Sequence, residues 1–297
     1  MRLAAWAILF VTLLLWSGNW IVARAVRDDV APGIATLGRL LIVLAVLAPF
    51  TWRALRGKLP RLGARDWQVL ATLGFTGGGL HLALQWLGLH YTTATSGMLY
   101  LSTSPVFILL LSAPVLGERI RAAQWLGVGV SFAGISVVAT GGHPAALLAL
   151  QFNVGDLLAI ASMAMWGAYT VCLRLRRDAL DTAEFITLVC ALGVAWMAPW
   201  VAWELAAGAP LRLAPAGYAG IAYSAIGSLL LAYAGWSYVV KRLGAARAGA
   251  TMHLMPAFGI GLSAIFLGEY PQPYHFAGIA LILAGVALAT LRRRSAA

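Results

Sequence analysis

The feature that most constrains this chain is a series of apolar stretches, each about as long as a membrane is thick. Ten of them follow one another, at 4–25, 34–52, 67–89, 94–115, 123–141, 155–174, 184–203, 217–240, 247–267 and 274–291. An α-helix needs roughly 20 mostly apolar residues to cross the hydrocarbon core, and a helix pairs its backbone polar groups within the segment. The series therefore predicts an all-α membrane protein with ten transmembrane helices.

Composition supports this prediction and excludes a soluble fold. Of the 297 residues, 61% are hydrophobic and 10% are charged, whereas a soluble domain carries about 25% charged residues. The loops between the stretches are short, so we expect no separate catalytic domain. The first stretch could instead be a cleavable signal peptide, because Ala23-Arg24-Ala25 loosely resembles a cleavage site. Its length, and the residues Trp16 and Asn19, favour a retained helix.

Basic residues predict the orientation. If residue 1 is cytoplasmic, the cytoplasmic segments hold seventeen of the 21 Lys and Arg residues, the opposite segments hold three, and Arg39 lies inside a stretch. Because Lys and Arg are enriched in cytoplasmic loops, we expect both termini in the cytoplasm. The net charge of +11 is spread over short clusters between the stretches, a pattern that does not indicate a nucleic-acid partner. The seventeen residues are Arg2, Arg53, Arg56, Lys58, Arg61, Arg65, Arg119, Arg121, Arg174, Arg176, Arg177, Lys241, Arg242, Arg247, Arg292, Arg293 and Arg294.

The two halves of the chain, 1–142 and 153–297, show a weak internal repeat. Residues that match at an offset of 151 include Pro105 with Pro256 and Gly117-Glu118 with Gly268-Glu269. Each half holds five stretches, an odd number, so the second half should cross the membrane in the opposite sense. Inverted repeats of this kind are a recurring plan of transporters, with the substrate site near the middle of the membrane.

The Trp16-Ser17-Gly18-Asn19 sequence and the segment from Pro105 to Gly117-Glu118, with their second-half counterparts, resemble the EamA-type family of the drug/metabolite transporter superfamily. The resemblance covers essentially the whole chain, and its short motifs identify a fold more specifically than a substrate. It implies ten helices, as two five-helix repeats, around a central cavity. The family includes exporters of amino acids and related metabolites, among them the YddG-type exporters. Ser17-Gly18-Asn19 is answered by Gly167-Ala168-Tyr169, so the two cavity walls should differ.

Aromatic and amide side chains share helical faces in the first and sixth stretches. Trp16, Asn19 and Trp20 are spaced three and four residues apart, and Trp166 and Tyr169 three apart, so each set lies on one face. An amide in the apolar middle of a helix needs a polar partner, and aromatic faces can hold an apolar or cationic group. We predict that both sets line the cavity. The alternative is that the tryptophans anchor the helices at the membrane interface.

Polar residues in three further stretches are candidates for the same cavity. His81 and Gln85 stand one turn apart in the third stretch, Tyr100 and Ser104 lie in the fourth, and His253 lies in the ninth. Ionisable residues inside a membrane are costly and commonly functional. A histidine there can also be a packing residue with an internal hydrogen bond, so a substrate or proton role and a structural role both stay open.

Two prolines and one arginine complete the candidates. Proline inside a helix removes one hydrogen bond and bends the helix, so Pro105 and Pro256 are predicted hinges, although proline is also simply more frequent in membrane helices. Arg39 is the one cation well inside a stretch. Its default interpretation is that the side chain snorkels to the nearby interface, and the alternative is that it binds a substrate carboxylate.

The sequence thus predicts a multi-pass inner-membrane transporter that exports aromatic or other apolar amino acids, or related metabolites, by alternating access. A membrane-embedded enzyme is the first alternative, but it would need convergent catalytic groups, and the sequence shows no such constellation. A non-transporting assembly partner is the second. We expect a small-molecule substrate, the lipid bilayer as surroundings, no cofactor or metal, and a monomer rather than a dimer.

Overall fold

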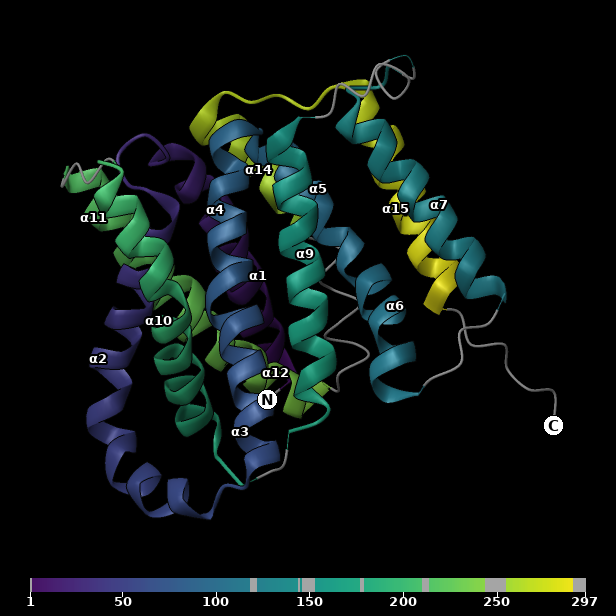
Figure 1. The fold of residues 1–297 in the computed structure, drawn as a ribbon. Helices are drawn as coiled ribbons and strands as arrows, with labels where there is room; N and C mark the ends of the chain where they lie inside the picture. The colour runs from purple at the N-terminus through teal and green to yellow at the C-terminus, as the bar shows by residue number, and fades with distance from the viewer. Residues whose placement is uncertain are drawn as a thin grey trace, which may run out of the picture.

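In the computed structural model, residues 2–117, 122–143, 145, 153–176, 179–209, 214–243 and 255–290 are described, and these residues contain helices and no β-strand (Figure 1). The first half holds α1 (Arg2–Ala25), α2 (Pro32–Lys58), α3 (Ala64–Leu73), α4 (His81–Tyr91), α5 (Ala94–Tyr100), α6 (Ser104–Leu116) and α7 (Ala122–Ala139). The second half holds α9 (Val154–Leu173), α10 (Thr182–Ala206), α11 (Pro215–Ala222), α12 (Ala232–Leu243), α14 (Met255–Leu267) and α15 (Pro273–Thr290).

Helix occupies every predicted stretch, except for 247–254, which lie outside the described residues. By length and composition, five helical segments could each cross a membrane: Leu3–Ala25, Pro32–Arg61, Val154–Leu173, Thr182–Ala206 and Pro215–Trp236. Shorter apolar helices cover Val106–Leu116, Ala122–Val138, Phe258–Leu267 and Pro273–Gly285. The described chain is therefore a set of apolar helices, several of which are interrupted or short.

Three of the predicted stretches are not regular α-helix. A π-helical turn, Gly74–Leu80, joins α3 to α4, and a second, Tyr223–Leu231, joins α11 to α12. A 3₁₀ turn, Leu101–Thr103, joins α5 to α6. π-Helical turns are rare and commonly occur at functional sites. The two turns stand about 150 positions apart, close to the offset of the sequence repeat.

Several large helix contacts join one half of the chain to the other. In the first half, α1 packs against α12 and α14, while in the second half α9 packs against α4 and α6. In addition α2 packs against α10, and α7 against α15. Because each of these contacts joins the two halves, neither half forms its own closed bundle, and the middle of the molecule is lined by both.

Helices α7 and α15 lie side by side at one edge of the bundle (Figure 1). Small residues bring them together. A Cβ placed on Gly285 would meet the Gly127 carbonyl and Ser131, and a Cβ on Gly134 would lie 2.6 Å from the Gly278 carbonyl oxygen. Glycines allow such close approach of helices in lipid. Gly127, Ser131 and Gly134 of α7 are thus buried against α15.

We predict that Gly285→Val destabilises the protein by about 1–3 kcal/mol, because the new side chain has no space between α15 and α7. Gly129→Val is the matched control, since a Cβ on Gly129 meets nothing within 4 Å. Thermal unfolding of the two variants in the same detergent measures the difference. Equal unfolding temperatures would show that the α7–α15 contact is not tight.

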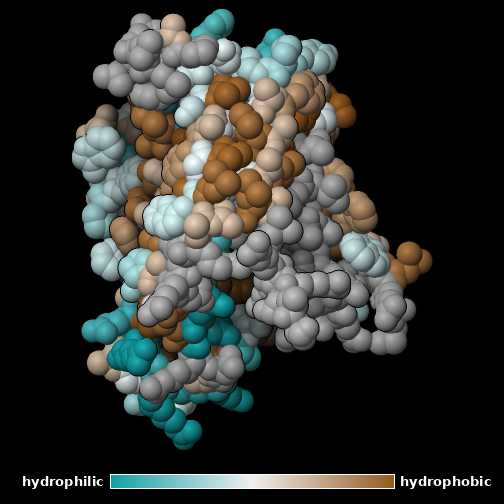
Figure 2. Space-filling model, turned by 90° about the vertical axis from the view of Figure 1, so that its right-hand side faces the viewer, coloured by the Kyte–Doolittle hydropathy of each residue, from teal (hydrophilic) through white to brown (hydrophobic). Residues whose placement is uncertain are grey.

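The outer face of this helix pair is apolar. Figure 2 shows hydrophobic side chains gathered on the helices of this face, with hydrophilic side chains toward the lower end of the molecule. The exposed large side chains of the pair are Trp125, Leu126, Phe132, Phe276 and Leu281. Water cannot solvate such a face at low cost, so it is suited to contact with lipid.

Candidate functional site

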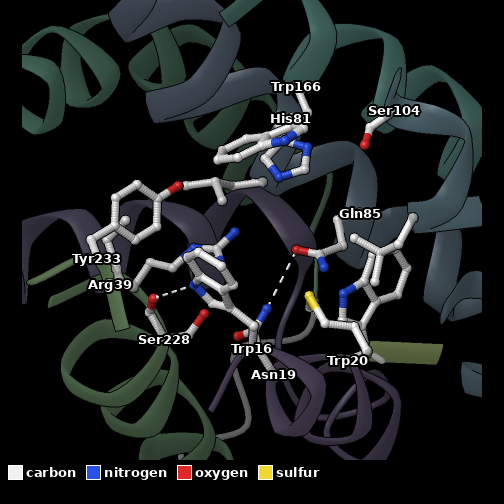
Figure 3. A pocket seen from close by; sticks show the side chains of 14 residues that line it. Trp16, Asn19, Trp20, Arg39, His81, Gln85, Ser104, Trp166, Ser228 and Tyr233 are labelled. Carbon is white, nitrogen blue, oxygen red and sulfur yellow. Dashed lines mark hydrogen bonds between the residues drawn. The ribbon is translucent and has the colours of Figure 1, made fainter. Parts of the chain in front are cut away.

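A cavity lies between helices of both halves (Figure 3). Its volume is about 60 Å³, below the roughly 300–1,000 Å³ of pockets that bury a small molecule, so the cavity is narrow in this state. Side chains from α1, α2, α4, α6, α9, α12, α14, the 3₁₀ turn and the second π-helical turn surround it. The lining residues are Trp16, Asn19, Trp20, Arg39, His81, Leu82, Gln85, Leu101, Ser104, Trp166, Ser228, Leu229, Tyr233 and Met255.

A chain of polar side chains crosses four helical segments at the cavity wall. Arg39 Nη1 donates to Ser224 Oγ at 3.0 Å, and Ser224 Oγ donates to Asn19 Oδ1 at 2.5 Å. Asn19 Nδ2 in turn donates to Gln85 Oε1 at 3.4 Å (Figure 3). These groups come from α2, the second π-helical turn, α1 and α4. Their network fixes the side chains relative to one another and satisfies the buried Asn19 amide.

Arg39 is the charged member of this network, and the snorkelling expectation for it is wrong. Its side chain is 1% exposed and faces the cavity, seven residues after the start of α2. Nη2 donates to Thr36 Oγ1 at 3.4 Å, and the guanidinium carbon lies 5.5 Å from the Trp86 ring centroid. The charge stays inside because the Ser224 hydroxyl and the Trp86 ring, both from other parts of the fold, surround it together with Thr36 of α2. An argument from one helix cannot include the first two.

Aromatic rings form another part of the wall, and Figure 3 shows Tyr233 beside Arg39. Tyr233 meets Trp16 edge-on at 5.8 Å between centroids and Trp166 edge-on at 6.3 Å. Trp16 Nε1 donates to the Ser228 carbonyl at 3.1 Å. These contacts hold the rings in place, so an apolar ligand would meet a fixed aromatic surface. Ser228 lies within the second π-helical turn and Tyr233 follows it, so the positions of both depend on that turn.

Hydrogen bonds to Ser162 of α9 hold His81 in place. Its Nδ1 lies 2.9 Å from the Ser162 carbonyl oxygen, and Ser162 Oγ donates to the His81 carbonyl at 2.8 Å. Because a carbonyl only accepts, Nδ1 carries the proton in that contact, which leaves Nε2 of a neutral ring as an acceptor. The ring packs 5.2 Å from Trp166. His81 therefore has an internal hydrogen bond and also lines the cavity.

The structure brings most of the predicted cavity residues together. Trp16, Asn19, Trp20, His81, Gln85, Ser104 and Trp166 line the cavity, as does Arg39. Tyr169 does not. Tyr169 is 6% exposed, and its ring stacks on that of Trp166 with 5.3 Å between the centroids. A spacing of three residues places both rings on one face of α9, where Trp166 covers Tyr169. Tyr100 is fully buried beside Asp156 and also lies outside the lining. His253 lies outside the described residues.

Asp156 is a buried carboxylate that the sequence analysis did not select. It is 4% exposed, accepts a hydrogen bond from the Thr92 hydroxyl and neighbours Tyr100. Its sequence position does not indicate a functional role, because Asp156 stands in the first turn of α9, where an acidic residue also stabilises a helix terminus. Asp156 does not line the cavity, and the described residues contain no group of three His, Cys, Asp or Glu side chains suited to a metal.

At the end of the bundle where α1 stops, Glu269 joins both halves. Its carboxylate accepts from Arg24 Nε at 3.3 Å and from the Ala94 and Thr95 amides at 2.8 and 3.3 Å. Glu269 thus binds a distant arginine and the first amides of α5. We call this contact the Arg24–Glu269 bridge. Glu118, its counterpart in the repeat, lies outside the described residues.

The backbone around Pro105 departs from α-helix as the sequence predicts for a proline. Pro105 stands in the first turn of α6, directly after the 3₁₀ turn. Pro105 has no amide hydrogen to donate to the Leu101 carbonyl, and this carbonyl instead accepts from the Ser104 amide. This tighter hydrogen bond replaces the missing one. Pro256 is the second residue of α14, and the residues before Met255 lie outside the described part.

These features, a helical membrane protein with a cavity shared between two halves, agree with comparisons to known proteins. The model of the EamA-like transporter family matches the chain twice, at residues 3–140 and 153–291. The chain therefore belongs to the EamA-like transporter family, a family of transporters, and is a multi-pass membrane protein.

Individual relatives span nearly the whole chain. A probable terminal-alkyne amino-acid exporter of Streptantibioticus cattleyicolor is 30% identical over 97% of this chain and 94% of its own length. An uncharacterized transporter of Archaeoglobus fulgidus is 27% identical over 96% of this chain and 97% of its own. A solved crystal structure of a 23% identical protein superimposes with a TM-score of 0.60, covering 98% of this chain and 97% of that one. That structure supports the fold alone.

Proposed function

We propose that this chain exports amino acids with apolar or aromatic side chains, or related small metabolites, across the inner membrane by alternating access. In this proposal the protein has ten transmembrane helices in two inverted halves, with both termini in the cytoplasm. The amino-acid exporter named among its relatives supports this substrate class. The distribution of Lys and Arg supports the orientation.

One observation carries the proposal. A buried arginine and a fixed set of aromatic rings face the same cavity, which is lined from both halves of the chain. A guanidinium group binds carboxylates well, and the rings suit an apolar side chain. An amino acid with an apolar side chain presents both groups on one small molecule.

The helix contacts support alternation. Contacts of α1 with α12 and α14 correspond, under the sequence repeat, to contacts of α9 with α4 and α6. Two halves related in this way can exchange conformations, so that one end closes while the other opens. In the state described, the end that the charge bias makes periplasmic is held by the Arg24–Glu269 bridge above buried apolar residues that include Trp20, Leu89 and Met98.

The test is transport by the purified protein in proteoliposomes, with radiolabelled amino acids on the inside and outside in separate runs. We expect flux of apolar or aromatic amino acids, and little flux of acidic or strongly basic ones. The control is protein inactivated by heat in the same vesicles. Folded protein that moves none of the panel would contradict the assigned substrate class.

Pro105→Ala should slow transport more than it lowers the amount of folded protein in the membrane. Alanine restores the missing amide, so the 3₁₀ turn can revert to α-helix and the joint between α5 and α6 becomes stiffer. Initial transport rates, normalised to the folded protein recovered by size-exclusion chromatography, measure this. A proline outside the repeat motif, Pro199 within α10, serves as the matched control as Pro199→Ala. Unchanged transport in Pro105→Ala would remove the hinge role.

A further inference from the structure

The cavity holds an arginine whose charge has no carboxylate partner among the described residues. The described residues form three ion pairs, and none of them includes Arg39: Arg24–Glu269, Arg27–Asp28 and Lys58–Glu184. Arg39 donates to two neutral hydroxyls, of Ser224 and Thr36, and its Nε has no protein partner while being fully buried. A buried charge of this kind is costly unless it is paired, so the site is incomplete without an anion.

In the part of the chain that the structure describes, no acidic side chain lines the cavity. The chain has ten Asp and Glu residues in all, and the eight that the structure describes lie outside the lining. Several are used elsewhere: Glu184 pairs with Lys58, Glu204 accepts from the first amides of α2, and Asp156 accepts from Thr92. The other two, Glu118 and Asp178, lie in sequence between the predicted stretches. Among the described lining residues, an ammonium group in the cavity would therefore meet neutral groups and the like charge of Arg39.

The neutral groups do not require an ammonium. Asn19 and Gln85 already bond to each other, and Asn19 Oδ1 accepts from Ser224. The remaining wall is aromatic, and aromatic rings hold apolar groups as well as cations. The net charge of the described lining residues is thus +1 without a ligand and zero with a bound monoanion, whereas a bound zwitterion leaves it at +1.

Resting on the proposed function, we propose that the cavity selects monocarboxylates with an apolar or aromatic tail and does not require the α-ammonium group. N-acylated or deaminated forms of apolar amino acids, which carry one negative charge and no positive one, then bind at least as tightly as the amino acids. The carboxylate is placed on Arg39, and the tail against Trp16, Trp166 and Tyr233.

A series of ligands that share one phenyl ring tests this proposal. L-Phenylalanine is a zwitterion, N-acetyl-L-phenylalanine and 3-phenylpropanoate are anions, and L-phenylalaninamide is a cation when protonated. Binding to the purified wild-type protein in nanodiscs is followed by quenching of tryptophan fluorescence, with isothermal titration calorimetry as the second readout. We expect both anions to bind at least as tightly as L-phenylalanine, and the amide to bind at least about 10-fold more weakly, because it lacks the charge-assisted bond to Arg39.

The same series on Arg39→Met separates the role of charge from that of the tail. In this variant we expect the advantage of the anions over the amide to disappear. The proposal is overturned if L-phenylalanine binds more tightly than both anions, if neither anion binds, or if the amide binds as well as the anions. Flux is measured separately in proteoliposomes. Binding of the anions without flux of any ligand supports the recognition proposed here and contradicts the transport function.

Discussion

Replacing Arg39 with methionine should reduce transport of carboxylate substrates by about 10- to 100-fold, because one charge-assisted bond is worth about 1.5–3 kcal/mol. Methionine fills similar space without charge or hydrogen-bond donors. The loss should appear as weaker substrate binding. The unfolding temperature, in contrast, should stay the same or rise, because the substitution removes a buried charge without a carboxylate partner in the described part of the chain.

Two controls separate this effect from a general loss of structure. Arg27→Met removes an arginine that is 32% exposed and paired with Asp28, and it should leave transport unchanged. Arg39→Lys keeps the charge but not the planar donor fork, and it should fall between wild type and Arg39→Met. If Arg39→Met instead unfolds the protein at a lower temperature and keeps wild-type binding, Arg39 is a structural residue and not a ligand for substrate.

Replacing Glu269 with glutamine should open the end of the bundle where α1 stops. The carboxylate holds Arg24 and two α5 amides together, and glutamine keeps the shape while losing the charge. Both side chains are nearly one-fifth exposed, so solvent screens part of the interaction. A loss of about 1.4 kcal/mol from the closed state is a tenfold change in the population of the open state.

A cysteine in the cavity reports this change. In a background with Cys172→Ala and Cys190→Ala, Ser104→Cys places a thiol on the cavity wall. We expect a membrane-impermeant maleimide, added outside intact cells, to label it about tenfold faster in Glu269→Gln. Glu184→Gln is the control. Glu184 pairs with Lys58, the last residue of α2, away from the end where α1 stops, so this substitution should not speed labelling from outside. Equal labelling of the Glu269→Gln variant and the parent would mean that the bridge does not hold this end closed.

The sequence predicted the helical segments well because apolar composition is averaged over some twenty residues, and small local errors cancel. It also brought Trp16, Asn19 and Trp20 to one face, since α1 is regular over its whole length. The third and eighth stretches contain π-helical turns, and each such turn shifts the helical register that follows it. A fixed spacing of 3.6 residues could not place Ser228, which lies within such a turn, or Tyr233, which follows it.

Contacts between distant parts of the chain were outside the reach of the sequence. Arg39 is retained inside by Ser224, which is 185 positions away, and Glu269 binds Arg24 across 245 positions. No local pattern marks either pair. Asp156 was missed for a related reason, because its partner Thr92 lies in the other half of the chain and its own position resembles an ordinary helix start.

If this cavity is the substrate site of a carrier that opens to one side at a time, the protein must support counterflow. Proteoliposomes are loaded with an excess of unlabelled L-phenylalanine and diluted into a trace of the radiolabelled form. A carrier accumulates the label transiently above its outside concentration, whereas a channel only equilibrates it. We expect a transient overshoot with the wild-type protein and its loss in Arg39→Met. Simple equilibration by the folded wild-type protein would show that it is not a carrier. An undiminished overshoot in Arg39→Met would show that this cavity is not the substrate site.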